Sequence, residues 1–252
     1  MNKSLSERNK RNVNVRWNKQ YELLRKHIEN FPKDRYLLLK TRLSSNIAGD
    51  GSVSVRKENK NQKSVHYTIS FYPDEMNMLN CFLRDFEELY LKKPTVKNMG
   101  KYYTVRVDSK FAVLDLLEET NYGSLEWKLP ENLLKNKKLK VEWLKAFFDC
   151  ESHVAKSCIQ LQSVNQKGIN QIKGLLEEIG ISCKIYSYER KNKNWNTNYI
   201  LCIMSKEERL KYLDRIGFNN LKKLKSLKET LYARMPELVK GPVSKTGVRK
   251  DM

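Results

Sequence analysis

Apolar positions recur along this chain with two spacings, one typical of helices and one typical of strands. From Arg35 the apolar residues keep helical spacing until the glycines at 49 and 51, so a helix is expected there. Residues 52–57 and 64–72 alternate apolar with polar side chains, and the polar segment between them is typical of a hairpin loop. The pattern then predicts a helix over 75–91, a hairpin formed by 95–98 and 102–107, and a helix through 111–117.

After a break the same order of elements returns. Residues 121–140 hold Gly123, Pro130 and a run of Asn and Lys, a composition typical of a linker. The restarted pattern predicts a helix over 141–150, a hairpin over 153–163, a helix over 165–180, a hairpin formed by 182–188 and 197–204, and a helix over 206–216. An internal repeat of this kind predicts an α+β fold built from two similar halves.

The repeat divides the chain into five expected segments. These are a basic N-terminal arm over 1–34, a first repeat over 35–120, a linker over 121–140, a second repeat over 141–217, and a C-terminal helix with a basic tail over 218–252. The N-terminal arm is dense in Lys and Arg, so we expect it to touch phosphates rather than to form a domain.

An acidic residue stands at the same point of each repeat, where the first helix ends. The two segments are Leu43-Ser-Ser-Asn-Ile-Ala-Gly-Asp50-Gly51 and Leu144-Lys-Ala-Phe-Phe-Asp-Cys-Glu151-Ser152. Asp50 and Glu151 each occupy the eighth position and lie 101 residues apart. Taken singly, Asp50 would be a turn residue and Glu151 an exposed helix-end acid. Their repetition favours a shared metal site, since Mg²⁺ is often held by one or two carboxylates.

These segments, and the repeat around them, resemble the LAGLIDADG homing endonucleases of the single-chain, two-motif type. The likeness extends from about Arg35 to Asp214. It implies two pseudo-symmetric αββαββα repeats, each with a four-stranded antiparallel sheet, which form a saddle over duplex DNA. It also implies a monomeric, intron-encoded enzyme that makes a double-strand break at a long target site. Mg²⁺ would be the cofactor, and Mn²⁺ would substitute for it.

The resemblance assigns roles to individual residues near the acids. Asp50 and Glu151 would hold the metal together with the backbone carbonyls of Gly49 and Cys150. A basic residue is expected late in the last strand of a half, and by register this is Arg106.

The second half departs from this pattern, because the position that corresponds to Arg106 is occupied there by Cys202 or Met204, neither of which is basic. Lys156 or Gln162 is the candidate replacement, and the two DNA strands need not be cut with equal competence. Asp149 has no acidic counterpart in the first segment, so we expect it to be structural. Small side chains would let the two motif helices pack closely: Ser44, Ser45, Ala48, Gly49, Ala146 and Cys150.

The polar faces of the strands are the expected DNA-binding surface, because an antiparallel sheet or ribbon can lie in the major groove. For any single residue the alternative is an ordinary solvated sheet face. The candidates in the first half are Ser54, Arg56, His66, Thr68, Ser70 and Thr104, and those in the second half are Lys156, Gln160, Gln162, Lys184, Tyr186, Tyr188 and Arg190.

The charge of the chain supports a nucleic-acid partner. It carries 49 basic and 29 acidic residues, a net charge of +20, with an ordinary 40% of hydrophobic residues. A surplus of this size favours a polyanion such as double-stranded DNA. No apolar run approaches the ~20 residues that would span a bilayer. The five cysteines lack metal-site spacing and are expected to be reduced thiols. We therefore expect a cytoplasmic, nucleoid-associated protein in a prokaryote, or an organelle-matrix protein if an organelle encodes it.

Two rival interpretations keep the same fold. One is an intron RNA maturase, which would bind RNA and no longer cut DNA. The other is a DNA-binding regulator without metal chemistry, although neither end of the chain shows a clear helix-turn-helix. Intein splicing is not expected, because the chain begins with Met1 and ends without a His-Asn pair.

Overall fold

The structure, a computed structural model, describes residues 19–57, 65–189 and 196–232. Within these ranges both halves show the expected order of elements, so the predicted α+β repeat is confirmed. The first half consists of α2 (Lys33–Asp50), β1 (Gly51–Lys57), β2 (Val65–Phe71), α3 (Met76–Tyr90), β3 (Thr95–Asn98), β4 (Tyr103–Asp108) and α4 (Lys110–Leu117). The second half consists of α5 (Lys137–Glu151), β5 (Ser152–Val154), β6 (Ile159–Ser163), α6 (Gln166–Glu178), β7 (Lys184–Tyr188), β8 (Asn198–Ile203) and α7 (Lys206–Arg215).

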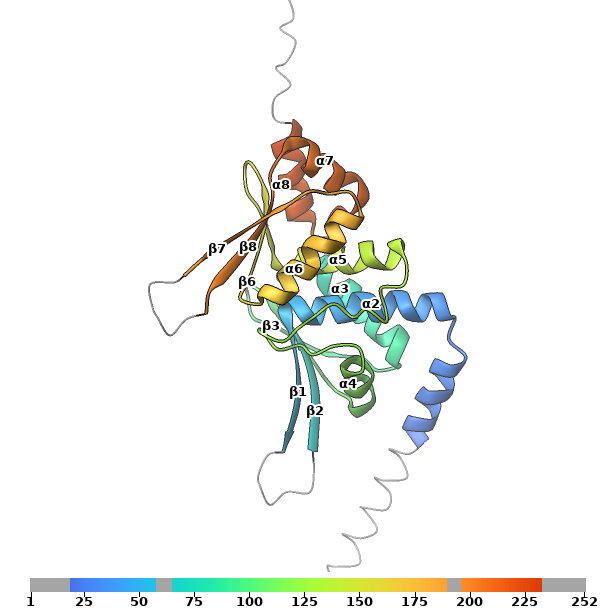
Figure 1. Cartoon of the computed structure of the whole chain (residues 1–252). Helices are drawn as coiled ribbons and strands as arrows, with labels where there is room; N and C mark the ends of the chain where they lie inside the picture. Colours follow the sequence, from blue (N-terminus) through green and yellow to red (C-terminus); the bar gives the residue numbers. More distant parts are fainter. Residues whose placement is uncertain (1–18, 58–64, 190–195, 233–252) are drawn as a thin grey trace, which may run out of the picture.

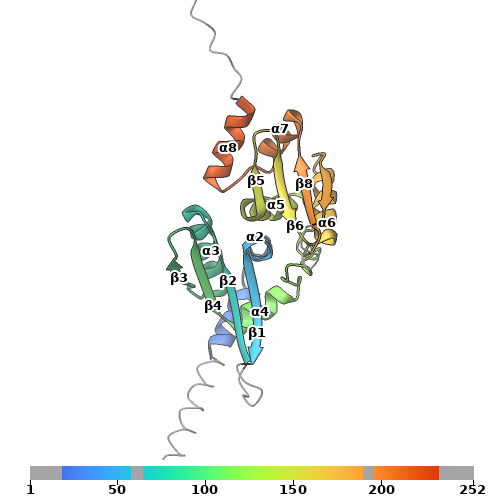
Figure 2. The same ribbon diagram turned by 90° about the vertical axis from the view of Figure 1, so that its left-hand side faces the viewer.

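Each half forms a four-stranded antiparallel sheet, in the orders β1-β2-β4-β3 and β5-β6-β8-β7. Side chains alternate along a strand, so each sheet has one apolar and one polar face. The apolar faces are buried through Ile69, Phe71, Val105, Val107, Ile159, Leu161, Leu201 and Ile203. Both sheets lie to one side of the helices (Figure 1), and α2 and α5 lie at the centre between them (Figure 2).

Small side chains bring α2 and α5 together, as the sequence predicts. Ser44, Ser45, Ala48 and Ala146 are all buried. Ser45 Oγ donates to the carbonyl of Trp143 at 2.6 Å, and Tyr122 donates to Ser44 Oγ at 3.1 Å, so both hydroxyl groups are paired. These bonds let two polar residues lie within the packed interface without the cost of an unpaired buried group.

The segment between the halves is packed rather than loose. Trp127, Leu133 and Leu134 are buried, and the Trp127 ring lies 4.9 Å from that of Phe147. The prediction that α5 begins at Val141 was wrong, because the helix begins at Lys137. Its N-terminus is set by Asn136, whose side chain accepts a hydrogen bond from the backbone N–H of Leu139.

Two further helices flank the repeats. A helix over 19–29 packs on the first half, where His27 Nε2 lies 3.0 Å from the carbonyl of Glu88. At the other end α8 (Leu221–Tyr232) follows α7 and buries Leu227 and Leu231. No helix in the described ranges is long and apolar enough to cross a membrane.

Gly49 is the residue whose size this packing depends on most. A Cβ at Gly49 would lie 2.6 Å from Cys150 Cβ, a distance that forces the helices apart. We expect Gly49→Ala to lower the free energy of unfolding by about 1–3 kcal/mol, the usual cost of overpacking. Gly174→Ala in α6 is the matched control, because a Cβ there meets nothing within 4 Å. The control should gain up to about 1 kcal/mol from helix propensity. Urea unfolding of both variants measures this, and equal stabilities would contradict the close crossing.

Candidate metal centre and nucleic-acid interface

The structure brings the two predicted acids together at the ends of the central helices. Asp50 is the last residue of α2 and Glu151 is the last residue of α5, and a strand begins immediately after each. The helix ends are in contact, since a Cβ at Gly49 would lie 3.5 Å from Glu151 Cγ. Cys150 Sγ lies 3.9 Å from the side-chain oxygen of Asn46 on the opposite helix. The two acids therefore lie at adjacent helix ends.

Both carboxyl groups have raised pKa values. Burial is the main cause that raises the pKa of Glu151 to about 7, and the neighbouring charge of Asp50 contributes to the same rise. Burial also raises the pKa of Asp50, with a smaller contribution from Asp74. Lys223 acts in the opposite direction on both acids. Burial together with like charge makes the ionised pair costly, and a bound cation would relieve that cost.

The donor atoms at this point suit Mg²⁺. The site offers two carboxylates and the C-terminal carbonyls of two helices, all of them hard oxygen donors. The helix ends also carry the negative pole of the backbone dipole. Within the described ranges no group of three or more His, Cys, Asp or Glu side chains could hold a metal. A two-carboxylate Mg²⁺ site is thus compatible with these residues, and a His- or Cys-based transition-metal cluster is not found among them.

Asp149 has a separate, structural contact. Its carboxylate accepts hydrogen bonds from the backbone N–H groups of Asn219 at 2.9 Å and Asn220 at 2.8 Å, just before α8 begins. Burial raises the Asp149 pKa to about 6, while the two backbone bonds act to lower it. Both of its oxygens accept these backbone hydrogen bonds, which agrees with the expectation that Asp149 is structural.

Lys223 is a residue of this site that the sequence did not indicate. Its ammonium donates to three successive carbonyls at the end of α5, those of Phe148 at 3.2 Å, Asp149 at 2.6 Å and Cys150 at 3.0 Å. Burial lowers its pKa. Lys223 lies beyond both repeats among other lysines, and no feature of the sequence distinguishes it from Lys222 or Lys225.

In the first sheet, the strand register places the predicted residues on one face. Ser70 pairs with Ser52 on one side and with Arg106 on the other, and Thr68 pairs with Ser54. Arg56 pairs with His66 further along the same face. Arg106 is exposed and bonds Asp108 at 3.2 Å. Arg106 therefore lies two strands from β1, in the row of residues that includes Ser52.

In the second sheet, the register settles which residue corresponds to Arg106. Gln160 pairs with His153 and with Cys202, just as Ser70 pairs with Ser52 and Arg106. Cys202 is therefore the counterpart of Arg106, since Met204 lies beyond the end of β8. Lys184 pairs with Cys202 from β7 and is the basic side chain of this row.

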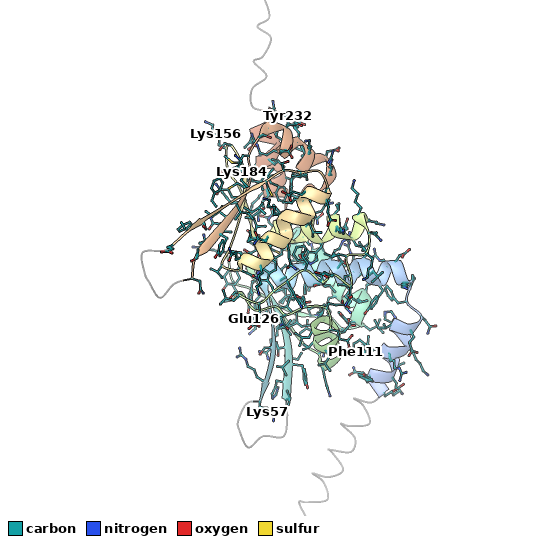
Figure 3. All side chains as sticks on the ribbon, viewed as in Figure 1. Lys57, Phe111, Glu126, Lys156, Lys184 and Tyr232 are labelled. Atoms are coloured by element: carbon teal, nitrogen blue, oxygen red, sulfur yellow. The ribbon has the colours of Figure 1, made fainter. Side chains whose placement is uncertain are left out.

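The other predicted residues of the second half take different places. Gln162 pairs with Ile200, which pairs in turn with Tyr186, and Tyr188 pairs with Asn198 on the same face. Lys156 is exposed in the turn that joins β5 and β6, where Ala155 donates to the carbonyl of Cys158. Figure 3 shows Lys156 and Lys184 at the second sheet and Lys57 at the far end of β1. Arg190 lies outside the described residues. Thr104 in the first sheet pairs with Lys97.

Part of the second half of the chain matches a known protein family. Residues 138–217 match the family model of the LAGLIDADG-like domain. The chain is 27% identical over 186 residues to the replication factor C small subunit of Methanocaldococcus jannaschii. It is 26% identical over 170 residues to the uncharacterized protein MJ0314 of the same organism. These matches cover 72% and 61% of this chain but only 10% and 58% of the two relatives.

A solved structure of similar fold is that of the homing endonuclease I-DmoI in complex with DNA and Mn. The match has a TM-score of 0.58 at 17% identity and covers 72% of this chain and 97% of I-DmoI. At this identity the match shows the fold alone. It confirms the two-domain LAGLIDADG fold that the sequence predicts.

The raised pKa values lead to a prediction about stability. A carboxyl group whose pKa is raised by folding stabilises the native state below its unfolded pKa, and this stabilisation is lost as pH rises through the folded pKa. For Glu151 the window runs from its usual value of 4.5 to about 7. We expect the free energy of unfolding without divalent ions to fall by about 1–3 kcal/mol between pH 5 and pH 8.

Denaturant unfolding at several pH values, with chelator present, measures this slope. Glu151→Gln should reduce the slope, because position 151 then has no carboxyl group to ionise, while Asp50 and Asp149, whose pKa values are also raised, keep part of it. Glu131→Gln, a change at an exposed glutamate, should leave it as in the parent. A Glu151→Gln slope equal to the parent's would show that Glu151 ionises freely in the folded protein.

Proposed function

We propose, from the LAGLIDADG-like second domain and the two-domain LAGLIDADG fold, that this chain is a sequence-specific DNA endonuclease that makes a double-strand break at a long target site. The observation that carries the proposal is the contact between two helix ends, each with a half-buried acid at the same motif position. A fold built only to bind DNA gains nothing from two like charges placed together at low dielectric. A nuclease that needs a divalent cation does gain from them, because the two carboxylates can bind that cation.

Asp50 and Glu151, with the carbonyls of Gly49 and Cys150, would hold the divalent ion. Bound Mg²⁺ or Mn²⁺ would neutralise charge on the scissile phosphate and lower the pKa of an attacking water. The helix ends fix the carboxylates in place, since each acid is at the junction of a packed helix and a strand. I-DmoI, whose structure was solved with DNA and Mn, supports the choice of ion.

The polar sheet faces would bind the duplex. Both faces adjoin the acids through β1 and β5, so DNA lying across them would pass over the acid pair. The net charge of +20 supplies the attraction for phosphate. Because one chain holds both motif helices, a monomer would suffice. The exchange of Arg106 for Cys202 between the halves would make the two strand cuts unequal.

The first test is cleavage of DNA by the purified chain. A library of long random or genomic duplexes is incubated with the protein and Mg²⁺, and broken ends are sequenced. We expect one discrete site, cut in both strands. Specific binding without any cutting would favour the regulator, and binding to intron RNA alone would favour the maturase.

The acids are tested on the selected site. Asp50→Asn and Glu151→Gln preserve side-chain size and remove charge, so each should lower double-strand cleavage by at least about 100-fold while specific binding persists. Asp34→Asn, at the exposed start of the same helix as Asp50, is the matched control and should cut like the parent. Parental cutting by either acid variant would remove these carboxylates from the metal site.

Target choice is tested on the sheet faces. Arg56→Ala and Gln160→Ala should each weaken binding of the selected site by about 1–3 kcal/mol, the usual worth of a good base contact. Gln166→Ala, at the exposed start of α6, should bind like the parent. Titration of labelled duplexes with single base changes measures both affinity and discrimination. Unchanged discrimination in both sheet variants would place the DNA on another surface.

A further inference from the structure

Helix α8 lies beyond both repeats, yet it is joined to the end of α5 by two reciprocal contacts. Asp149, near the end of α5, accepts hydrogen bonds from the backbone N–H groups of Asn219 and Asn220 at the start of α8. In return Lys223, in the first turn of α8, donates to the carbonyls of Phe148, Asp149 and Cys150. Each contact matches the sign of the helix dipole that it meets.

The start of α8 is held from the first half as well. Asn77 donates to the carbonyl of Asn219, Asn220 Nδ2 lies 3.5 Å from Met78 Sδ, and Lys222 pairs with Glu75. These three partners lie at the beginning of α3. The start of α8 is therefore held by contacts to both halves, and these contacts fix Lys223 at the end of α5.

The position of this ammonium matters because of one shared atom. Lys223 Nζ lies 3.0 Å from the Cys150 carbonyl oxygen, which is one of the proposed metal ligands. Lys223 is also the basic residue whose charge acts on both Asp50 and Glu151 in the described structure. The Lys223 ammonium lies within hydrogen-bond distance of this carbonyl oxygen. A divalent ion bound to the same oxygen would therefore be strongly repelled by the ammonium, because the site is partly buried.

We propose that Lys223 is a positioning residue that competes with the divalent ion for the acid pair and the Cys150 carbonyl. In the metal-free protein it offsets the charge of Asp50 and Glu151 and fixes the last turn of α5. The divalent ion then binds by displacing the ammonium, so α8 sets the affinity of the site for metal. This inference rests on the proposed metal-dependent endonuclease.

Binding of Mn²⁺ to the DNA-free protein tests the competition without any measurement of activity. Calorimetry or electron paramagnetic resonance gives the dissociation constant. Lys223→Met should bind Mn²⁺ tighter than the parent by about tenfold or more, because a positive charge beside the ion is gone. Lys225→Met in the same helix is the control, since Lys225 is exposed and pairs with Glu229. It should leave the constant unchanged.

Two more variants keep the result decisive. Lys223→Gln retains a hydrogen-bond donor for the carbonyls and lacks the charge, so it should also tighten Mn²⁺ binding, and it carries the test if Lys223→Met does not fold. Lys223→Arg retains the charge and should bind Mn²⁺ like the parent. A purely structural role predicts the opposite for Lys223→Met and Lys223→Gln, because a disordered α5 terminus would bind Mn²⁺ more weakly.

The outcomes separate this inference from the proposed function. Equal or weaker Mn²⁺ binding by the uncharged variants, beside a parent that cuts DNA with Mg²⁺, overturns the competition and leaves the endonuclease standing. A parent without measurable Mn²⁺ binding and a Lys223→Met variant that binds would support the competition in its strongest form. Absence of both Mn²⁺ binding and DNA cleavage in the parent and in the uncharged variants would overturn both proposals.

Discussion

The close crossing of α2 and α5 is the constraint on which the rest of this structure depends. At Gly49 and Cys150 the helices are so near that an added methyl group has no room. The approach places Asp50 and Glu151 next to each other, where burial raises the pKa values of both acids and the charge of Asp50 adds to the rise at Glu151. Two like charges at such a place oppose folding. The surrounding contacts must therefore hold the helices together against this repulsion.

Several contacts do so from different elements. Arg42 on α2 bonds Glu142 on α5 at 2.7 Å and also pairs with Asp85 on α3. Ser45 bonds the Trp143 carbonyl deep in the interface. Nearer the acids, Lys223 binds the last carbonyls of α5. The two halves thus meet through packing, a charge network and a helix that belongs to neither repeat. A bound divalent ion would relieve the charge repulsion between Asp50 and Glu151 that these contacts hold in place, and this relief would contribute to its affinity.

The sequence predicted those parts of the structure that follow from local periodicity. Alternation in the strands and the helix ending at Gly49-Asp50-Gly51 defined the first half, and repetition of the order located the second acid. The start of α5 was missed because residues 137–140 are mostly lysine, and the capping bond of Asn136 overrides that composition. The buried side chain of Trp127 was missed because it stands alone in a segment with the composition of a linker.

Other features of the site depend on tertiary contacts that no local pattern records. The choice between Cys202 and Met204 as the counterpart of Arg106 needed the strand register. Lys223 could not be found from sequence, because its partners are backbone carbonyls of a distant helix. A lysine among lysines carries no signal for such a contact. The two motif acids were predictable because repetition is visible in sequence, whereas the cation beside them was not.

The most direct measurement of the central claim is the location of Mn²⁺ in crystals of the chain bound to its selected DNA site. Anomalous scattering from Mn²⁺ identifies the ion independently of the protein density. We expect a peak at the α2–α5 junction, within coordination distance of both Asp50 and Glu151 and close to a scissile phosphate. A peak that contacts neither carboxylate, with none at the junction, would contradict a shared metal site at the helix ends.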